Sequence, residues 1–263
     1  MKKILHTAAA VGVSCFLASA ANASLVTEWE FAVTAGFTGA ATFDADTGGT
    51  TIETATELSW GKTGGDYTDT TQNSTNSRSA LVITNPAVSG SLFTNGGPAV
   101  TSTLTHYNNT ILRSFESLLG ATINTTFALT PKVPAGEPRE TIDRDITFSF
   151  IETPNKEDCG FVSASECDDI FVLNPADLTD TFIYNDFVYT TRVIPVGLGP
   201  LSDGACTVAG AETGCFGLQT LEGQANAFGV LVDITARAVP VPATLALFGL
   251  GLIGVAVTRR RKV

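Results

Sequence analysis

Apolar and polar residues alternate in Ile146-Thr147-Phe148-Ser149-Phe150-Ile151, and Val230-Leu231-Val232-Asp233-Ile234-Thr235 also has one apolar face. Successive side chains of a strand point to opposite faces, so this alternation is typical of strands that bury one face. Seven other runs rich in β-branched and aromatic residues are expected strands: residues 25–33, 51–60, 79–84, 100–106, 121–129, 169–173 and 181–194. The pattern predicts a mainly β protein, an antiparallel β-sandwich with a jelly-roll-like arrangement.

One stretch has a helical period instead. Between residues 111 and 119, the apolar side chains Ile111, Leu112, Phe115, Leu118 and Leu119 would share one face of a helix. We expect at most one short helix in the sandwich, and this stretch is the candidate.

The middle of the chain is strongly acidic. The 263 residues carry a formal net charge of −11, with 44% hydrophobic and 16% charged residues, which is too apolar and too weakly charged for a disordered chain. Between residues 24 and 238, nine Lys and Arg stand against twenty-six Asp and Glu, a net charge of −17. Such a surface repels phosphate backbones, so we expect no nucleic-acid partner.

The N-terminus has the pattern of a secretory signal peptide. Lys2 and Lys3 precede an apolar run over residues 8–20, which is followed by Ala21-Asn22-Ala23. A basic start, a short apolar run and small residues at the cleavage site together predict removal of residues 1–23, with cleavage after Ala23. An uncleaved anchor is the alternative.

The C-terminus has the pattern of a membrane-spanning helix. Residues 239–257 contain no charge, and as a helix they would be about 28 Å long, close to the thickness of a hydrocarbon core. The basic residues Arg259, Arg260, Arg261 and Lys262 follow directly and predict a cytoplasmic tail. Residues 24–238, the body of the chain, would then lie outside the cytoplasm. A buried core helix is the alternative.

The tail begins with Val239-Pro240-Val241-Pro242 and ends with the arginine cluster at 259–261. This assembly resembles the PEP-CTERM sorting signal of Gram-negative bacteria, although Val241 stands where that family usually has Glu. The terminal patterns and this resemblance together predict three regions: a signal peptide (1–23), a secreted β-sandwich domain (24–238) and a sorting signal (239–263). It also implies a transient stay in the inner membrane, processing by an exosortase, and export to the cell surface or the exopolysaccharide matrix.

His106 is the single histidine after residue 23, and it lies in Thr105-His106-Tyr107-Asn108. In a strand, His106 and Asn108 share one face. A lone strand histidine usually makes a structural hydrogen bond to a carbonyl or hydroxyl, and this is the interpretation we favour. Thr105, His106 and Asn108 also resemble the signature of the THxN family of PEP-CTERM proteins, for which no activity is assigned.

Four cysteines remain after residue 23: Cys159, Cys167, Cys206 and Cys215. Export to an oxidising compartment favours disulfides, for which three pairings exist. We favour the local pairs, Cys159–Cys167 and Cys206–Cys215, because each brackets a polar segment with turn residues. A Cys₄ zinc site is the alternative, although neither gap has the usual zinc-ligand spacing.

The sequence contains few signs of catalytic or metal chemistry. A single histidine allows at most one nucleophilic constellation, and no Gly-x-Ser-x-Gly is present. Calcium is a weak alternative at Asp44, Asp46 and Glu53, whose spacing departs from that of an EF-hand loop. We interpret this stretch as a solvated turn, and the acidic cluster at 166–169 as solvated too. We therefore expect neither a metal ion nor another cofactor.

These observations predict a surface or matrix protein without enzymatic activity. The alternative is a carbohydrate-binding module or a glycoside hydrolase acting on exopolysaccharide, because carboxylates are plentiful. Aromatic platforms would favour the alternative, but Trp29 and Trp60 are the two tryptophans and no aromatic cluster is evident in the sequence.

Overall fold

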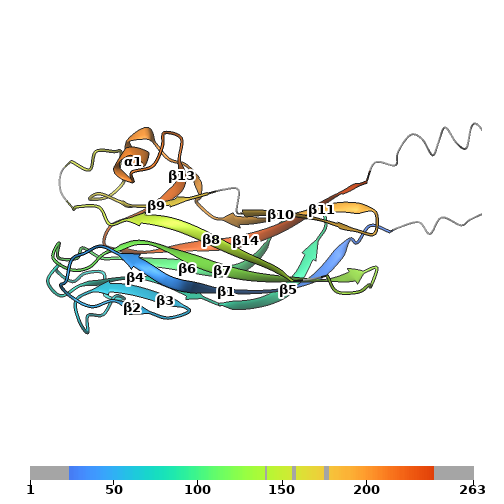
Figure 1. Ribbon diagram of the computed structural model, residues 1–263, viewed down its shortest axis with the longest axis horizontal. Helices are drawn as coiled ribbons and strands as arrows, with labels where there is room; N and C mark the ends of the chain where they lie inside the picture. Colours follow the sequence, from blue (N-terminus) through green and yellow to red (C-terminus); the bar gives the residue numbers. More distant parts are fainter. Residues whose placement is uncertain (1–23, 140, 156–157, 175–177, 240–263) are drawn as a thin grey trace, which may run out of the picture.

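The computed structural model describes residues 24–139, 141–155, 158–174 and 178–239. Two seven-stranded antiparallel sheets pack against each other as a sandwich, which confirms the predicted fold class (Figure 1). Sheet 1 has the order β12 (Gly199–Pro200), β13 (Phe216–Thr220), β9 (Asp169–Leu173), β8 (Ile142–Ile151), β7 (Leu118–Val133), β1 (Glu28–Phe43) and β5 (Ala87–Phe93). Sheet 2 has the order β10 (Thr179–Tyr184), β11 (Phe187–Pro195), β14 (Gln224–Ala238), β6 (Ala99–Asn108), β4 (Arg78–Thr84), β3 (Glu57–Gly61) and β2 (Ile52–Glu53).

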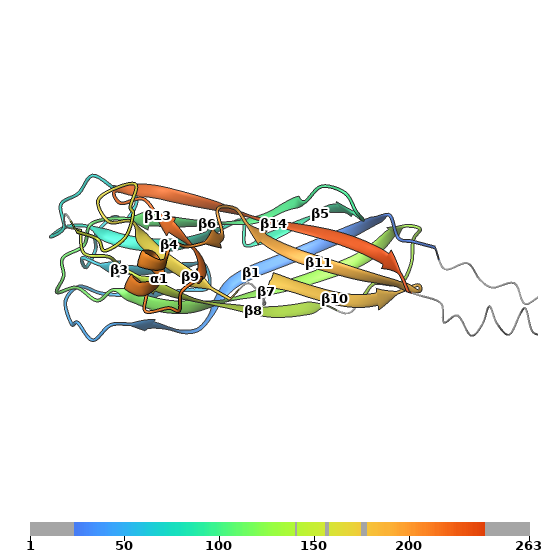
Figure 2. The same ribbon diagram turned by 90° about the horizontal axis from the view of Figure 1, so that it is seen from above.

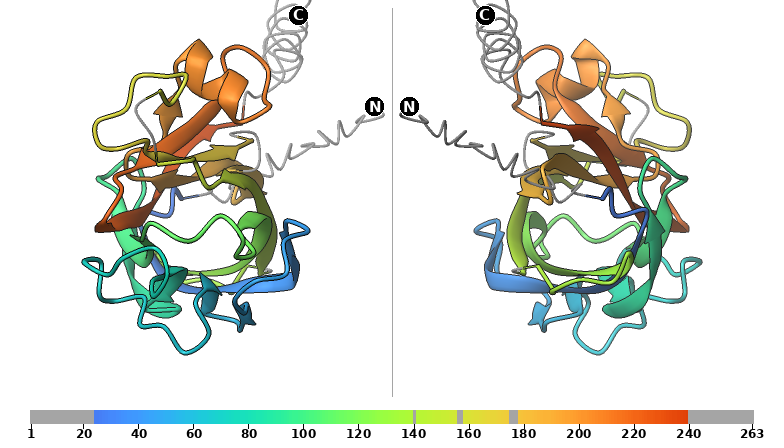
Figure 3. Two further views of the ribbon diagram at one scale, coloured as in Figure 1. Left: turned by 90° about the vertical axis from the view of Figure 1, so that its left-hand side faces the viewer. Right: turned by 90° about the vertical axis from the view of Figure 1, so that its right-hand side faces the viewer.

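The sandwich is elongated along its strands (Figure 2). Strand β1 begins and strand β14 ends at the same end, which we call the terminal end; it is the right-hand end in Figure 1. The opposite, distal end carries β9, β13 and the short helix α1 (Asp203–Val208). Seen along the long axis, both sheets curl around a common interior (Figure 3).

The core consists of two clusters of buried side chains. In the terminal-end cluster, Trp29 packs edge-on against Tyr189, with ring centroids 5.1 Å apart, and Phe31 and Ile234 lie beside them. The distal cluster surrounds Trp60 and contains Phe148, Phe150 and Phe171. Both clusters take side chains from both sheets, so burial of apolar surface holds the layers together.

The prediction of a helix over residues 111–119 is wrong. Most of this stretch is a loop, and its last two residues begin β7. The Gly48 N–H donates to the Ser114 carbonyl at 2.9 Å, and the Glu116 N–H donates to the Gly48 carbonyl at 3.1 Å. A Cβ on Gly48 would lie 2.2 Å from the Ser114 oxygen, so the contact needs glycine. These bonds occupy the Ser114 carbonyl and the Glu116 N–H, which would have been paired within the helix if one had formed.

The helix that does form, α1, was not expected. Its N-cap is Ser202, whose hydroxyl accepts a hydrogen bond from the Ala205 N–H at 3.2 Å, and Asp203 lies in its first turn. A serine followed by an acidic residue is a usual helix start.

Both of the favoured disulfides are present. Cys159 pairs with Cys167 and Cys206 with Cys215, with Cα–Cα distances of 5.3 and 5.7 Å. One bridge closes the loop before β9, and the other joins α1 to the segment before β13. The covalent links therefore strengthen the distal end, where the segments between strands are long.

The signal peptide predicted over residues 1–23, including Ala23, lies outside the described residues, and so does the membrane span predicted over 239–257, except for Val239. In the part of the chain that is described, no helix has the length and apolar character needed to cross a membrane.

Candidate functional site

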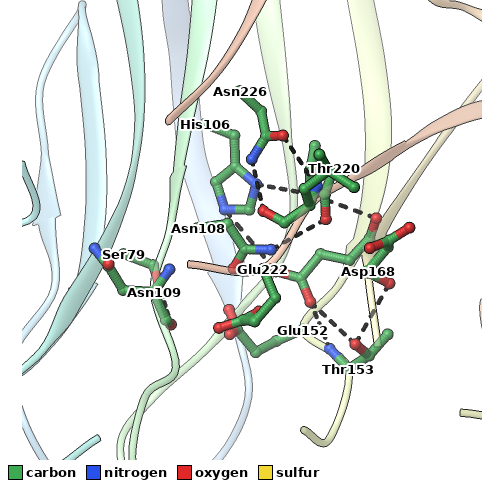
Figure 4. Close-up of polar contacts among 12 residues, drawn as sticks. Ser79, His106, Asn108, Asn109, Glu152, Thr153, Asp168, Thr220, Glu222 and Asn226 are labelled. Carbon is green, nitrogen blue, oxygen red and sulfur yellow. Dashed lines mark hydrogen bonds and ion pairs between the residues drawn. The ribbon is translucent and has the colours of Figure 1, made fainter. Parts of the chain in front are cut away.

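Strand β6 directs His106 and Asn108 into the space between the sheets. Both side chains are buried, and both reach Thr220 on β13 of the opposite sheet (Figure 4). His106 Nδ1 lies 2.9 Å from Thr220 Oγ1, and Asn108 Nδ2 donates to the Thr220 carbonyl at 3.2 Å. Thr105 is also buried, and it pairs in β6 with Val82 and Ala227. The shared face predicted for His106 and Asn108 is therefore the face that joins the sheets at the distal end.

Aromatic rings enclose the His106 imidazole. Trp60 stacks on it with centroids 5.9 Å apart, and Phe150 and Phe171 approach it edge-on at 5.2 and 5.4 Å. Burial lowers the pKa of His106 to about 3, because the charged form would lose its water. The imidazole is therefore neutral and forms no ion pair. His106 Nε2 lies 4.0 Å from Asp169 Oδ2, which is too far for a hydrogen bond.

The neutral imidazole has a defined tautomer. Thr220 Oγ1 lies 3.4 Å from the Asp169 carbonyl, which can only accept, so we assign the hydroxyl proton to that contact. The hydroxyl then accepts from His106 Nδ1–H, and Nε2 is left as an acceptor that faces Asp169.

Three carboxyl groups lie around this histidine. Asp169 accepts from the Thr153 N–H at 2.7 Å, Glu152 accepts from Trp60 Nε1 at 3.0 Å, and Glu222 accepts from the Thr110 hydroxyl at 2.8 Å. Burial is the main cause that raises the pKa of each, and repulsion among the three raises the pKa of Glu152 and Asp169 further. We call His106, Asn108, Glu152, Asp169, Thr220 and Glu222 the polar cluster.

Some polar atoms of this cluster lack a hydrogen-bond partner among the described residues. They are His106 Nε2, Asn108 Oδ1, Asp169 Oδ2 and Glu222 Oε2. Across those same residues, no group of three or more His, Cys, Asp or Glu side chains is arranged to hold a metal ion. Burial shifts the pKa values of the histidine and of the three acids toward their uncharged forms, and uncharged forms cost less to bury.

The acidic cluster at residues 166–169 is not solvated as a whole, which corrects our expectation. Asp168 is 3% exposed and Asp169 fully buried. Asp168 accepts from the Ala164 and Ser165 N–H groups at 2.9 and 3.0 Å. It thereby organises the loop closed by the first disulfide, which explains why a carboxylate is kept out of water.

In the stretch considered for calcium, Asp44 and Glu53 accept hydrogen bonds from backbone N–H groups. Asp44 Oδ1 accepts from the N–H groups of Asp46 and Ser117, each at 3.2 Å. Glu53 Oε2 accepts from the Ala41 N–H at 2.8 Å. Both carboxylates therefore accept hydrogen bonds from backbone N–H groups of the chain.

The sequence predicts that His106 and Asn108 share a face but does not identify their partners. It predicts a solvated Asp169, and the strand and motif patterns do not mark Glu152, Thr220 or Glu222. The detectable signal is a carboxylate at the end of a strongly apolar strand, as in Phe150-Ile151-Glu152. A charged residue that follows directly on buried aromatics is a candidate for a buried position.

Residues 238–262 match the PEP-CTERM protein-sorting motif. This motif starts at Ala238, the last residue of β14, and includes Pro240, Pro242 and the arginine cluster at 259–261. It implies an exported protein that is processed by an exosortase, and the two disulfides are consistent with an extracytoplasmic location. No curated protein matches the chain.

Proposed function

We propose that this chain is a non-catalytic component of the cell surface or exopolysaccharide matrix of a Gram-negative bacterium, delivered through its C-terminal signal. The observation that carries the proposal is the sorting motif, which begins where the last strand ends. In this proposal, residues 239–257 hold the protein transiently in the inner membrane, with the body periplasmic and the basic tail cytoplasmic. An exosortase then releases the body.

The position of the C-terminal tail at one end of the sandwich supports this proposal. Strand β14 ends at the terminal end, so a tail anchored there leaves the distal end pointing away from the membrane (Figure 1). The distal end carries both disulfides and the polar cluster, which fix its loops. A covalently strengthened end suits a surface that meets the extracellular medium.

The environment of His106 supports a role without catalysis. The side chain is fully buried, its pKa is lowered to about 3, and aromatic rings surround it. A general base must reach the substrate proton and have a pKa near the working pH, and this histidine meets neither condition. We propose that the chain belongs to the THxN family of PEP-CTERM proteins, with Thr105, His106 and Asn108 as its motif, in which His106 and Asn108 join the two sheets.

The alternative, a carbohydrate-binding module or glycoside hydrolase, has less support. Trp29 and Trp60 are fully buried, so neither offers a platform for a sugar ring. Asp169, the most deeply buried carboxyl of the cluster, is out of reach of a polysaccharide. Incubation of the protein with exopolysaccharide from its own source decides the matter, because depolymerisation by wild type but not by folded His106→Ala would overturn the non-catalytic role.

Deletion of residues 240–263 tests delivery. The truncated protein should appear in the periplasm or the medium and should be lost from the cell surface or matrix, as judged by fractionation and immunoblotting. Replacing Arg259, Arg260 and Arg261 with Gln should disturb the orientation of the tail. The matched control is Arg237→Gln, which removes an exposed charge just before the motif. Unchanged surface delivery of the truncated protein would contradict the proposal.

A further inference from the structure

Four strands form the outer edges of the two sheets in the part of the chain that the structure describes: β12 and β5 in sheet 1, and β10 and β2 in sheet 2. Strands β12 and β2 have only two residues each. Strand β10 has six, and its Asp180 forms ion pairs with Arg139 and Arg144. Short strands and charged residues protect a sheet edge, whose unpaired backbone groups could otherwise pair with another chain.

Strand β5 lacks this protection and is the longest of the four edges. Its seven residues, Ala87–Phe93, include neither a charged residue nor a proline, and most of them are exposed. One side of the strand pairs with β1. Apart from the Phe93 carbonyl, which accepts from the Gly96 N–H, the described residues supply no backbone partner for its other side. This edge is therefore open to a further strand.

The two faces of β5 differ in their surroundings. Val88 and Leu92 pack in the terminal-end cluster, so they lie on the face that points into the sandwich. Gly90 lies between them on the same face, opposite Phe31, and a Cβ on it would come within 3.1 Å of the Phe31 ring. The outer face carries the remaining residues of the strand: Ala87, Ser89, Ser91 and Phe93.

The sequence of β5 is self-complementary about Gly90. A second β5 could lie antiparallel to the first, with Gly90 of one copy opposite Gly90 of the other. The residues opposed across this pairing would be Val88 with Leu92 on the inner face, and Ser89 with Ser91 and Ala87 with Phe93 on the outer face. Apolar residues then meet apolar residues, and serine meets serine. The small Ala87 leaves room for the Phe93 ring, which is 54% exposed in the single chain.

We propose that β5 is a homodimer interface, at which two copies of this chain pair antiparallel about a two-fold axis at Gly90. The pairing joins sheet 1 of both copies into one continuous sheet and gives partners to the backbone groups of both edges. Strand β5 lies within residues 79–112, which contain no charged residue, so these residues bring no like charges together. A two-fold interface uses the edge of each copy and closes, so it yields a dimer and not a fibre.

This inference is independent of the proposed function, because it rests on the sheet edge and not on the sorting signal. It also accounts for an exposed phenylalanine at the end of an edge strand, which the single chain leaves in contact with water.

Cysteine crosslinking tests the register of the pairing. Ser89→Cys and Ser91→Cys are made as separate full-length chains with tags of different mass, purified in mild detergent, mixed and oxidised. The cysteines of the described residues are already paired in disulfides and do not compete. Directly opposed residues have Cα atoms about 4.5–5.5 Å apart, which a disulfide can bridge. We expect a crosslinked heterodimer on a non-reducing gel.

Each cysteine variant alone should crosslink little. Two copies of residue 89, or of residue 91, would be diagonal neighbours about 7–8 Å apart, which is beyond the usual span of a disulfide. The absence of a heterodimer from the mixture, or equal crosslinking by either variant alone, would overturn the proposed pairing.

Ala87→Lys, introduced into both cysteine chains, tests the edge itself. Ala87 is exposed, so these chains should fold, which circular dichroism checks. A lysine opposite Phe93 should remove the crosslinked heterodimer, because a charge on an edge strand opposes pairing. The matched control is Thr181→Lys, which places the same charge on the β10 edge and should leave the heterodimer unchanged. A heterodimer that survives Ala87→Lys would also overturn the proposal.

Discussion

His106 Nδ1 on β6 lies 2.9 Å from Thr220 Oγ1 on β13, and this hydrogen bond joins the two sheets at the distal end of the sandwich. Both residues are fully buried. Asn108 adds a second bond to the same residue through the Thr220 carbonyl. One threonine thus receives both polar side chains that β6 directs inward at this end.

Thr220→Val should lower the free energy of unfolding by about 1–3 kcal/mol, because it leaves the His106 Nδ1–H buried without an acceptor. Thr220→Ser keeps the hydroxyl and serves as the matched control, with a smaller loss from the missing methyl group. Urea denaturation of both variants measures the difference. Equal stability of the valine variant and wild type would show that the bond does not hold the sheets together.

The imidazole of His106 should stay neutral down to about pH 4, because burial lowers its pKa to about 3. Below its unfolded pKa of about 6.5, the unfolded chain takes up a proton that the folded chain does not. This residue therefore contributes stability that is present above pH 6.5 and is lost as the pH falls toward 3. NMR titration of the ring in protein that lacks residues 1–23 gives the pKa directly, and a midpoint near 6.5 would contradict the buried site.

Glu152→Gln should raise the free energy of unfolding at pH 8, by about 1–2 kcal/mol, and should change it little at pH 4. Burial raises the pKa of Glu152, so the folded carboxyl keeps its proton above the unfolded pKa. Stability is therefore lost as the pH rises through that window. Glutamine cannot ionise, and its oxygen still accepts from Trp60 Nε1.

The matched control for that experiment is Glu212→Gln, which neutralises an exposed carboxylate near the second disulfide. Urea denaturation at pH 4 and pH 8 should show little difference between this control and wild type. If both variants gained the same stability at pH 8, the gain would come from the lower net charge and not from the burial of Glu152.

Replacing Cys206 and Cys215 together with alanine should lower the free energy of unfolding by about 2.5 kcal/mol, since the bridge closes a short loop in the unfolded chain. Loss of the buried Cys206 side chain adds to this. Thermal unfolding measures the change. Non-reducing peptide mapping should recover both local pairs in wild type, and crossed pairs or free thiols would contradict the structure.

Strands with a clear alternation could be predicted from the sequence, and those with a glycine or a hidden turn could not. The alternating runs at 146–151 and 230–235 lie within β8 and β14, and the apolar runs at 79–84 and 169–173 correspond closely to β4 and β9. The run at 181–194 is a hairpin, β10 and β11, because Asn185 and Asp186 take positive φ values of 46° and 59°. Asparagine and aspartate tolerate this conformation, which forms a tight turn between strands.

The polar cluster was harder to predict because its members come together only through the sheet order. Thr220 lies on β13, a five-residue strand that the sequence did not indicate. Gly217 weakens the strand pattern there, yet a Cβ at this position would lie 1.9 Å from the Phe171 carbonyl oxygen. The residue that hides the strand is therefore the one that lets β13 pair closely with β9.

Mass spectrometry of both ends of the native protein, isolated from the cell surface or matrix, tests the central claim most directly. The account predicts an N-terminus at Ser24 and a C-terminus that lacks the arginine cluster at 259–261, because the signal peptide and the sorting signal are both removed. Protein that is found only in the inner membrane, with Met1 and Val263 intact, would contradict it.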